Sequence, residues 1–139
     1  MRVNDVMTQG VISISPSDSV CDVAQLMKEH DVGAVPVVSE GKVQGIITDR
    51  DIVMRCMAEN KNYCEMTAEQ IMSKHVTAVN STDSIGDALE KMSDFQVQRL
   101  PVVDNGQLKG MLSLSDIARL RVYEEVSDAV AEIKMPSAH

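Results

Sequence analysis

The chain is poor in aromatic residues. Of its 139 residues, two are Tyr, one is Phe and none is Trp. A ligand site built on stacking between aromatic rings is therefore nearly excluded. The sequence also lacks any apolar run near the ~20 residues that a membrane-spanning helix needs, and the opening Met1–Asp5 lacks the basic start and apolar stretch of a signal peptide. We expect a cytoplasmic protein without a membrane span.

Basic residues are also scarce. Thirteen Lys and Arg face 21 Asp and Glu, which gives a formal net charge of −8. Phosphate backbones are bound by clustered Lys and Arg, and the closely spaced Arg119 and Arg121 are too few for such a surface. The composition therefore argues against a nucleic-acid partner. An anionic small molecule remains a candidate wherever local donors overcome the acidic background.

The cysteines do not form a disulfide framework. Cys21, Cys56 and Cys64 are odd in number and irregularly spaced. The simplest interpretation is three reduced cysteines that act as small hydrophobic side chains. Hydrophobic residues make up 44% of the chain, enough for a core of one compact domain or of two closely packed halves.

What the chain does contain is an internal repeat. Val11 and Val76 begin matching segments 65 residues apart, and the match continues without a gap. Val35-Pro36-Val37-Val38 corresponds to Leu100-Pro101-Val102-Val103. A fixed period sets the architecture before any motif is considered, and two copies of a small unit indicate a pseudo-twofold body with two equivalent clefts.

Each copy predicts the element order β-α-β-β-α. Apolar alternation predicts strands, helical spacing predicts helices, and Glu40-Gly41 and Asp104-Asn105-Gly106 predict hairpin turns. In the first copy the expected elements are 11–14, 19–30, 35–38, 43–48 and 48–59. In the second copy they are 76–79, 84–94, 100–103, 108–112 and a helix that Ser113 opens.

Three segments lie outside these units. The polar stretch 60–66 predicts an irregular linker, and Thr67 with Gln70 resembles a capping box before a short helix whose N-terminal counterpart is 3–7. Past Leu120, apolar residues recur at helical spacing and predict a C-terminal helix that ends before Pro136 and packs on the body or on a second subunit. These residues are Val122, Val126, Val130 and Ile133. We expect residues 1–60 to form the first repeat, 61–122 the second with a linker at 60–70, and 123–139 a C-terminal helix and tail.

The junction between the last strand and last helix of each repeat carries the candidate chemistry. It has the form Gly-x-x-Thr/Ser-x-x-Asp, with Gly45, Thr48 and Asp51 in one copy and Gly110, Ser113 and Asp116 in the other. The spacing puts a hydroxyl at the strand end and a carboxylate in the first helical turn. Such a pair is also an ordinary capping box, but its repetition inside a matching unit favours a site.

On these residues the chain resembles a tandem pair of CBS domains (cystathionine β-synthase type), a Bateman module, over roughly residues 1–122. The resemblance implies an α/β (α+β) fold of two β-α-β-β-α units packed sheet to sheet with pseudo-twofold symmetry, plus here a C-terminal helix. It also implies a homodimer shaped as a flat disc, and binding of AMP, ADP, ATP or similar adenosine-containing ligands in clefts between the units. The adenine nucleotide would act as a regulatory ligand, with no other cofactor.

The resemblance assigns the ligand-binding residues to two clefts. In that family the aspartate accepts from the ribose hydroxyls, a role that Asp51 and Asp116 inherit, with Thr48 and Ser113 beside ribose or phosphate. One cleft joins Ile12 and Val32 to Arg99, Ser113 and Asp116, and the other joins Thr77 and Val97 to Ala34, Thr48 and Asp51. Arg99 in the first cleft and Arg50 in the second would bind phosphate oxygens, unless they are solvated or paired with acidic neighbours.

Other functions remain open. The chain could be a protein-interaction module with vestigial clefts, although both aspartates favour binding. It could respond to metal or redox state through Cys56 and Cys64, with His75 as a third ligand, but the spacing matches no standard zinc pattern. No residue set supports catalysis, so an enzyme is not expected. Any output would pass to a separate, unidentified effector protein.

Overall fold

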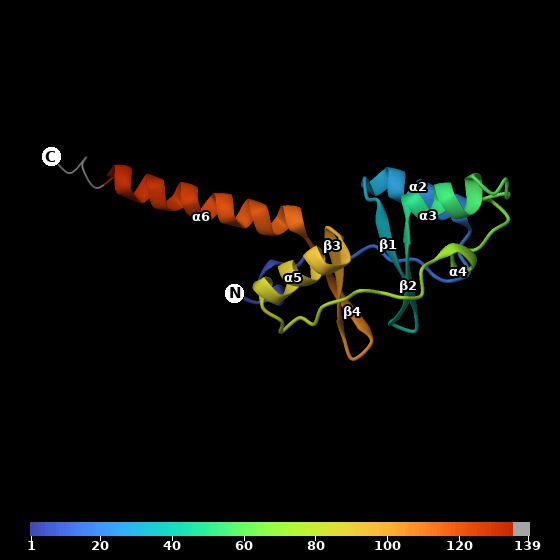
Figure 1. The fold of residues 1–139 in the computed structure, drawn as a ribbon, viewed down its shortest axis with the longest axis horizontal. Coiled ribbons are helices and arrows are strands. Elements are labelled where there is room, and N and C mark those ends of the chain that lie inside the picture. The colour runs from blue at the N-terminus through green and yellow to red at the C-terminus, as the bar shows by residue number, and fades with distance from the viewer. Residues whose placement is uncertain (135–139) are drawn as a thin grey trace.

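Two similar halves lie side by side, and a long helix projects from one of them (Figure 1). The computed structural model describes residues 1–134. The first repeat contains α2 (Val20–His30), β1 (Ala34–Ser39), β2 (Lys42–Thr48), α3 (Asp49–Ile52) and the π-helical turn η1 (Val53–Met57). The second contains α5 (Ile85–Phe95), β3 (Arg99–Asp104), β4 (Gln107–Ser113) and α6 (Leu114–Lys134). Short helices α1 (Val3–Val6) and α4 (Ala68–Ile71) precede the two repeats.

The hairpins β1–β2 and β3–β4 repeat the same register. Pro36 faces Ile46 in one and Pro101 faces Met111 in the other, and each has a bulge one residue later, after Val37 and after Val102. The strand order is β1-β2-β4-β3, but β2 and β4 pair only between Lys42 and Gln107. The predicted two-unit α/β fold with an additional C-terminal helix is therefore confirmed.

The predicted strands at 11–14 and 76–79 are wrong. Each segment makes one isolated parallel bridge, Ile14 to Val37 and Val79 to Val102. The amide of Ile14 donates to the Pro36 carbonyl at 3.0 Å, and the amide of Val38 donates back to Ile14 at 2.7 Å. Pro36 has no N–H to extend this ladder, and Pro101 occupies the same position beside Val79. Each proline is tolerated at the edge of its hairpin, but its missing N–H prevents the outer segment from pairing there as a third strand.

Matching caps begin the two central helices. The Ser19 hydroxyl accepts from the Asp22 amide at 3.1 Å, and the Ser84 hydroxyl accepts from the Asp87 amide at 3.0 Å. Both helices end at a left-handed residue, Asp31 or Gln96. The predicted capping box at Thr67 is confirmed, since its amide donates to Gln70 Oε1 at 2.9 Å. Sequence-local signals were sufficient here because a cap is made within one helical turn.

The short helix that precedes each repeat packs in the core of the other repeat. Val3 of α1 is buried with Val79, Met92 and Leu100 of the second repeat. Ile71 and Met72 are buried in the core of the first repeat, which also contains Val20, Val35 and Ile47. Backbone bonds fix this exchange: Thr8 and Met111 bond each other at 2.9 and 3.0 Å, and Ile46 and Ser73 at 3.0 and 2.8 Å.

The C-terminal helix differs from its prediction. One continuous helix, α6, replaces the predicted helix of the second repeat and the separate C-terminal helix. All side chains from Arg121 to Ala131 are exposed, so this part does not pack on the body as one of the two predictions held. No glycine or proline interrupts 114–134, and helix formation therefore continues beyond the last contact with the body.

The glycine of the repeated motif is required by the exchange. A Cβ on Gly110 would lie 2.7 Å from the Thr8 carbonyl oxygen, and one on Gly45 would lie 2.7 Å from the Ser73 carbonyl oxygen. We expect Gly110→Ala to lower the free energy of unfolding by about 1–3 kcal/mol, because a backbone atom must move. Urea denaturation followed by circular dichroism measures this.

Gly86 in α5 supplies the matched control. A Cβ there meets nothing closer than the Ser84 hydroxyl at 3.8 Å. Gly86→Ala should therefore raise stability, by about 0.5–1 kcal/mol, since alanine is the better helix former. Equal effects of the two substitutions would contradict the steric role of Gly110.

Candidate nucleotide-binding clefts

The first cleft lies between the repeats and has a volume of about 380 Å³. All five residues predicted for it line its wall: Ile12, Val32, Arg99, Ser113 and Asp116. Ala34, Ser115, Asp31 and Arg119 also line it. Its volume falls within the range of small-molecule sites, which are commonly apolar clefts with a few converging polar groups.

The strand-to-helix junction presents the polar groups of this cleft. β4 ends at Ser113, and its hydroxyl accepts from the Asp116 amide at 3.1 Å. This cap fixes the first turn of α6 and holds the Asp116 carboxylate toward the cleft. Ser113 is 7% exposed, and the Asp116 side chain 19% exposed. A carboxylate that is mostly buried but lines a cleft keeps oxygens available to a ligand that donates hydrogen bonds.

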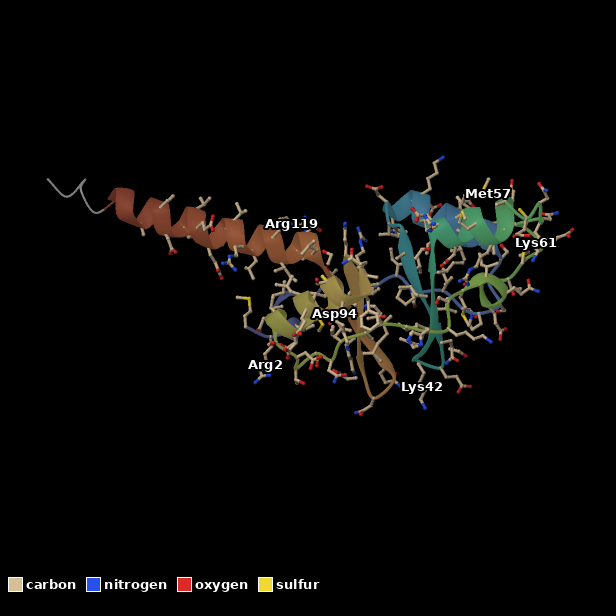
Figure 2. All side chains as sticks on the ribbon, viewed as in Figure 1. Arg2, Lys42, Met57, Lys61, Asp94 and Arg119 are labelled. Carbon is tan, nitrogen blue, oxygen red and sulfur yellow. The ribbon has the colours of Figure 1, made fainter. Side chains whose placement is uncertain are left out.

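Arg119 is paired with this carboxylate. Its guanidinium donates to Asp116 Oδ1 across one turn of α6, while the arginine side chain itself is 75% exposed. Figure 2 shows Arg119 on the portion of α6 that adjoins the body. Burial alone would raise the pKa of Asp116, but hydrogen bonds from Ser113 and the charge of Arg119 lower the pKa below its ordinary value. Asp116 is therefore ionised at neutral pH.

The second cleft has a volume of about 520 Å³ and contains part of its predicted set. Ala34, Thr48, Thr77 and Val97 line it as expected. Asp51 and Arg50 are not among its lining residues, and the acidic residue of that helical turn in the wall is Asp49. Asp51 Oδ2 accepts from the Thr48 amide at 2.9 Å, and Oδ1 lies 3.9 Å from Arg55 Nε. The predicted ligand roles of Asp51 and Arg50 remain predictions.

Sequence reasoning missed several lining residues. Arg99 and Ala34 line both clefts, so the arginine expected in one cleft serves two. Arg119 was missed although it lies three residues after Asp116, a spacing that puts both side chains on one helical face. His75 lines the second cleft. Its equivalent in the first repeat, Gly10, lines the first cleft. Comparing the copies at the 65-residue offset would have found this pair (Gly10 and His75).

The described residues contain neither a cluster of metal-ligating side chains nor a helix that could span a membrane. No group of three or more His, Cys, Asp or Glu side chains there is placed to hold a metal ion. Cys56 is fully buried, and its Sγ donates to the Lys61 carbonyl at 3.7 Å. Among helices in the same residues, none is both long and apolar enough to cross a bilayer.

Comparison with known proteins identifies the class. The CBS domain model matches residues 3–58 and 68–123, so the chain belongs to the CBS domain family as a tandem pair. Among its relatives, the CBS domain-containing protein YhcV of Bacillus subtilis (strain 168) is 36% identical over 99% of this chain and 98% of that protein. The match covers almost the whole of both chains.

Two solved structures are also informative. Hypoxic Response Protein I with two coordinated zinc ions is 32% identical, with a TM-score of 0.80 over 86% of this chain and 98% of the other. A protein of that name occurs in Mycobacterium tuberculosis. The CBS domain pair of protein MJ0100, in complex with 5′-methylthioadenosine and S-adenosyl-L-methionine, is 29% identical, with a TM-score of 0.78 over 89% of this chain and 98% of the other.

The ion pair in the first cleft predicts a measurable shift. Arg119→Ala should raise the pKa of Asp116 toward its ordinary value, because a positive charge that favours the carboxylate is removed. Carboxyl-carbon NMR titration measures the shift. Since the folded-state pKa is depressed, the stabilisation from Asp116 is present above the ordinary carboxyl pKa and is lost as pH falls through the depressed value.

Arg121→Ala is the control, because this exposed arginine lies further along the same helix. It should leave the Asp116 titration unchanged. An unchanged titration in Arg119→Ala would show that the Ser113 hydrogen bonds alone hold the pKa low.

Proposed function

We propose that this protein is a non-enzymatic regulatory module that binds adenosine-containing ligands such as AMP, ADP or ATP between its repeats. The first cleft carries the proposal, because it brings together apolar walls from one repeat and a hydroxyl, a carboxylate and an arginine from the other. A ligand there contacts both repeats at once.

The chemistry of this cleft suits a nucleotide. An ionised Asp116 offers two acceptor oxygens, and ribose offers two adjacent hydroxyl donors. Arg99 and Arg119 present guanidinium groups that match phosphate oxygens. The aliphatic Ile12 and Val32 provide surfaces against which an adenine ring can pack. A chain with so few aromatic residues needs such aliphatic walls.

Family structure supports the same ligand class. The CBS pair of protein MJ0100, similar in fold over most of this chain, is in complex with two adenosyl compounds.

We expect the first cleft to be the principal site here, because its wall contains the carboxylate of Asp116. The second cleft keeps Thr48 and Thr77 but turns Asp51 toward Thr48 and Arg55, and it should bind more weakly.

The regulatory step follows from the position of the ligand. A ligand that bridges the repeats can shift the equilibrium between two packing arrangements only by as much as its affinity differs between them. Because α6 begins in the wall of the first cleft and continues into solvent, this helix is the element through which binding would reach an effector protein (Figure 1).

Asp116 gives the direct test. We expect Asp116→Asn to weaken adenosine and AMP binding about tenfold or more, because an amide cannot accept two hydroxyl hydrogen bonds with the strength of a carboxylate. Asp51→Asn, the matched change in the other repeat, should have a smaller effect. Isothermal titration calorimetry measures both, after a thermal-shift screen with AMP, ADP, ATP and S-adenosylmethionine.

The absence of any shift across that screen would favour the interaction module with vestigial clefts. A larger effect of Asp51→Asn than of Asp116→Asn would make the second cleft the principal site.

Arg99 tests phosphate binding separately. We expect Arg99→Ala to weaken AMP binding about 10- to 100-fold and to leave adenosine binding nearly unchanged, because a charge-assisted hydrogen bond to phosphate is lost. Arg121→Ala should change neither. Equal losses for AMP and adenosine in Arg99→Ala would overturn the phosphate role.

We also propose that the protein is a cytoplasmic homodimer. Val53, Met54 and Met57 of η1 are each about half exposed, and such grouped apolar side chains mark interaction surfaces. Figure 2 shows Met57 on the half of the molecule opposite α6. Three cysteines without a disulfide framework favour a reducing compartment.

Charge insertion tests the dimer. In analytical ultracentrifugation we expect a dimer for the unaltered protein and a monomer for the Met54→Glu, Met57→Glu double variant, since burial of two carboxylates opposes association. Val126→Glu, on the exposed part of α6, is the comparison variant. Dissociation by Val126→Glu alone would place the interface on α6 instead.

A further inference from the structure

The linker between the repeats runs against the first turn of α2. The amide of Cys21 donates to the Tyr63 carbonyl at 3.0 Å, and the amide of Val20 donates to the Met66 carbonyl at 2.8 Å. A bridge between Ser19 and Thr67 continues the contact. The backbone near Cys21 is therefore held close to the backbone near Cys64.

This backbone contact brings two cysteines together. Cys21 donates its amide to the residue next to Cys64, and the Cys21 side chain is the main cause that raises the pKa of Cys64. Cys64 is exposed and Cys21 is half-buried. The third thiol, Cys56, is buried and engaged with the Lys61 carbonyl. The pair is thus Cys21 with Cys64, and not Cys56 with Cys64 as the redox alternative supposed.

We propose that Cys21 and Cys64 are a reversible disulfide-forming pair that fastens the inter-repeat linker to α2. The oxidant is a low-molecular-weight disulfide such as oxidised glutathione. The Cys64 thiolate attacks one sulfur of the oxidant, whose S–S bond breaks and releases one small thiol. The Cys21 thiolate then attacks Cys64 Sγ in this mixed disulfide and releases the second small thiol. Two protein thiols are oxidised and one small disulfide is reduced to two thiols.

The local charge sets the rate of this exchange. The neighbouring Cys21 side chain, together with burial and the nearby carboxylates of Asp22 and Glu65, raises the pKa of Cys64. Little Cys64 is thiolate at neutral pH, so the reaction should be slow there and faster in mildly alkaline buffer. The pair is suited to a sustained oxidising condition and not to rapid sensing of peroxide.

The disulfide requires no nucleotide. Neither cleft is lined by Cys21 or Cys64, so the proposal stands or fails independently of ligand binding.

Mass spectrometry of the folded protein tests the pair. After oxidised glutathione treatment in mildly alkaline buffer, we expect the chain to lose the mass of two hydrogen atoms and to remain one chain on a non-reducing gel. Peptide mapping should join Cys21 to Cys64, and dithiothreitol should reverse the change. The bond should form at least tenfold more slowly in concentrated urea, because the folded backbone supplies the high effective concentration of the second thiol.

Three variants separate the cysteines. Cys56→Ala should keep the linked product, because Cys56 takes no part. Cys64→Ser and Cys21→Ser should give no intramolecular bond, and the remaining thiol of the pair should carry glutathione. Cys64 is exposed, so its serine variant has no buried contact to lose.

Proteolysis reports the effect on the linker. Tyr63 is 47% exposed beside Cys64, and chymotrypsin cleavage after Tyr63 should slow several-fold on oxidation, since cleavage requires local opening. The proposal is overturned if the unaltered protein accumulates glutathione on Cys64 without linkage, if chains join through two Cys64 residues, or if Cys56 forms the bond.

Discussion

The rest of the structure depends on one exchange: the short segment that precedes each repeat packs on the other repeat. Thr8 bonds to Met111 of the second repeat, and Ser73 bonds to Ile46 of the first. These contacts bring a backbone carbonyl against the strand that leads into each junction, where only glycine leaves enough room. The core of the first repeat includes residues of α4, and the core of the second includes Val3 of α1. Neither repeat is therefore structurally independent.

The clefts follow from this arrangement. Because the exchange sets the two hairpins side by side, the end of β4 faces the segment around Ile12, and the end of β2 faces the segment around Thr77. Two related clefts result, but their chemistry differs. The first has an ionised carboxylate beside two arginines, whereas in the second the matching carboxylate completes a capping box. A duplicated fold thus carries two unequal sites.

The last helix, α6, begins in the wall of the first cleft and extends into solvent. Asp116 and Arg119 line the cleft from its first two turns, and the same helix continues through Val122, Val126 and Val130, which are exposed. The corresponding segment of the first repeat takes a π-helical turn and ends at Met57. The repeats therefore diverge where each leaves its junction, and the helix of the second repeat extends beyond the body (Figure 1).

The sequence by itself determined the features that depend on neighbours in the chain. The hairpin turns, the caps at Ser19, Ser84 and Thr67, and the hydroxyl–carboxylate junctions are formed within a few residues. The five residues that the family resemblance assigned to the first cleft all line it. The tertiary structure decided what depends on distant partners. Pro36 and Pro101 limit the outer segments to single bridges, and the backbone of Cys21 bonds to the linker beside Cys64. Such contacts arise from packing between segments far apart in the chain, and a local sequence pattern carries no record of them.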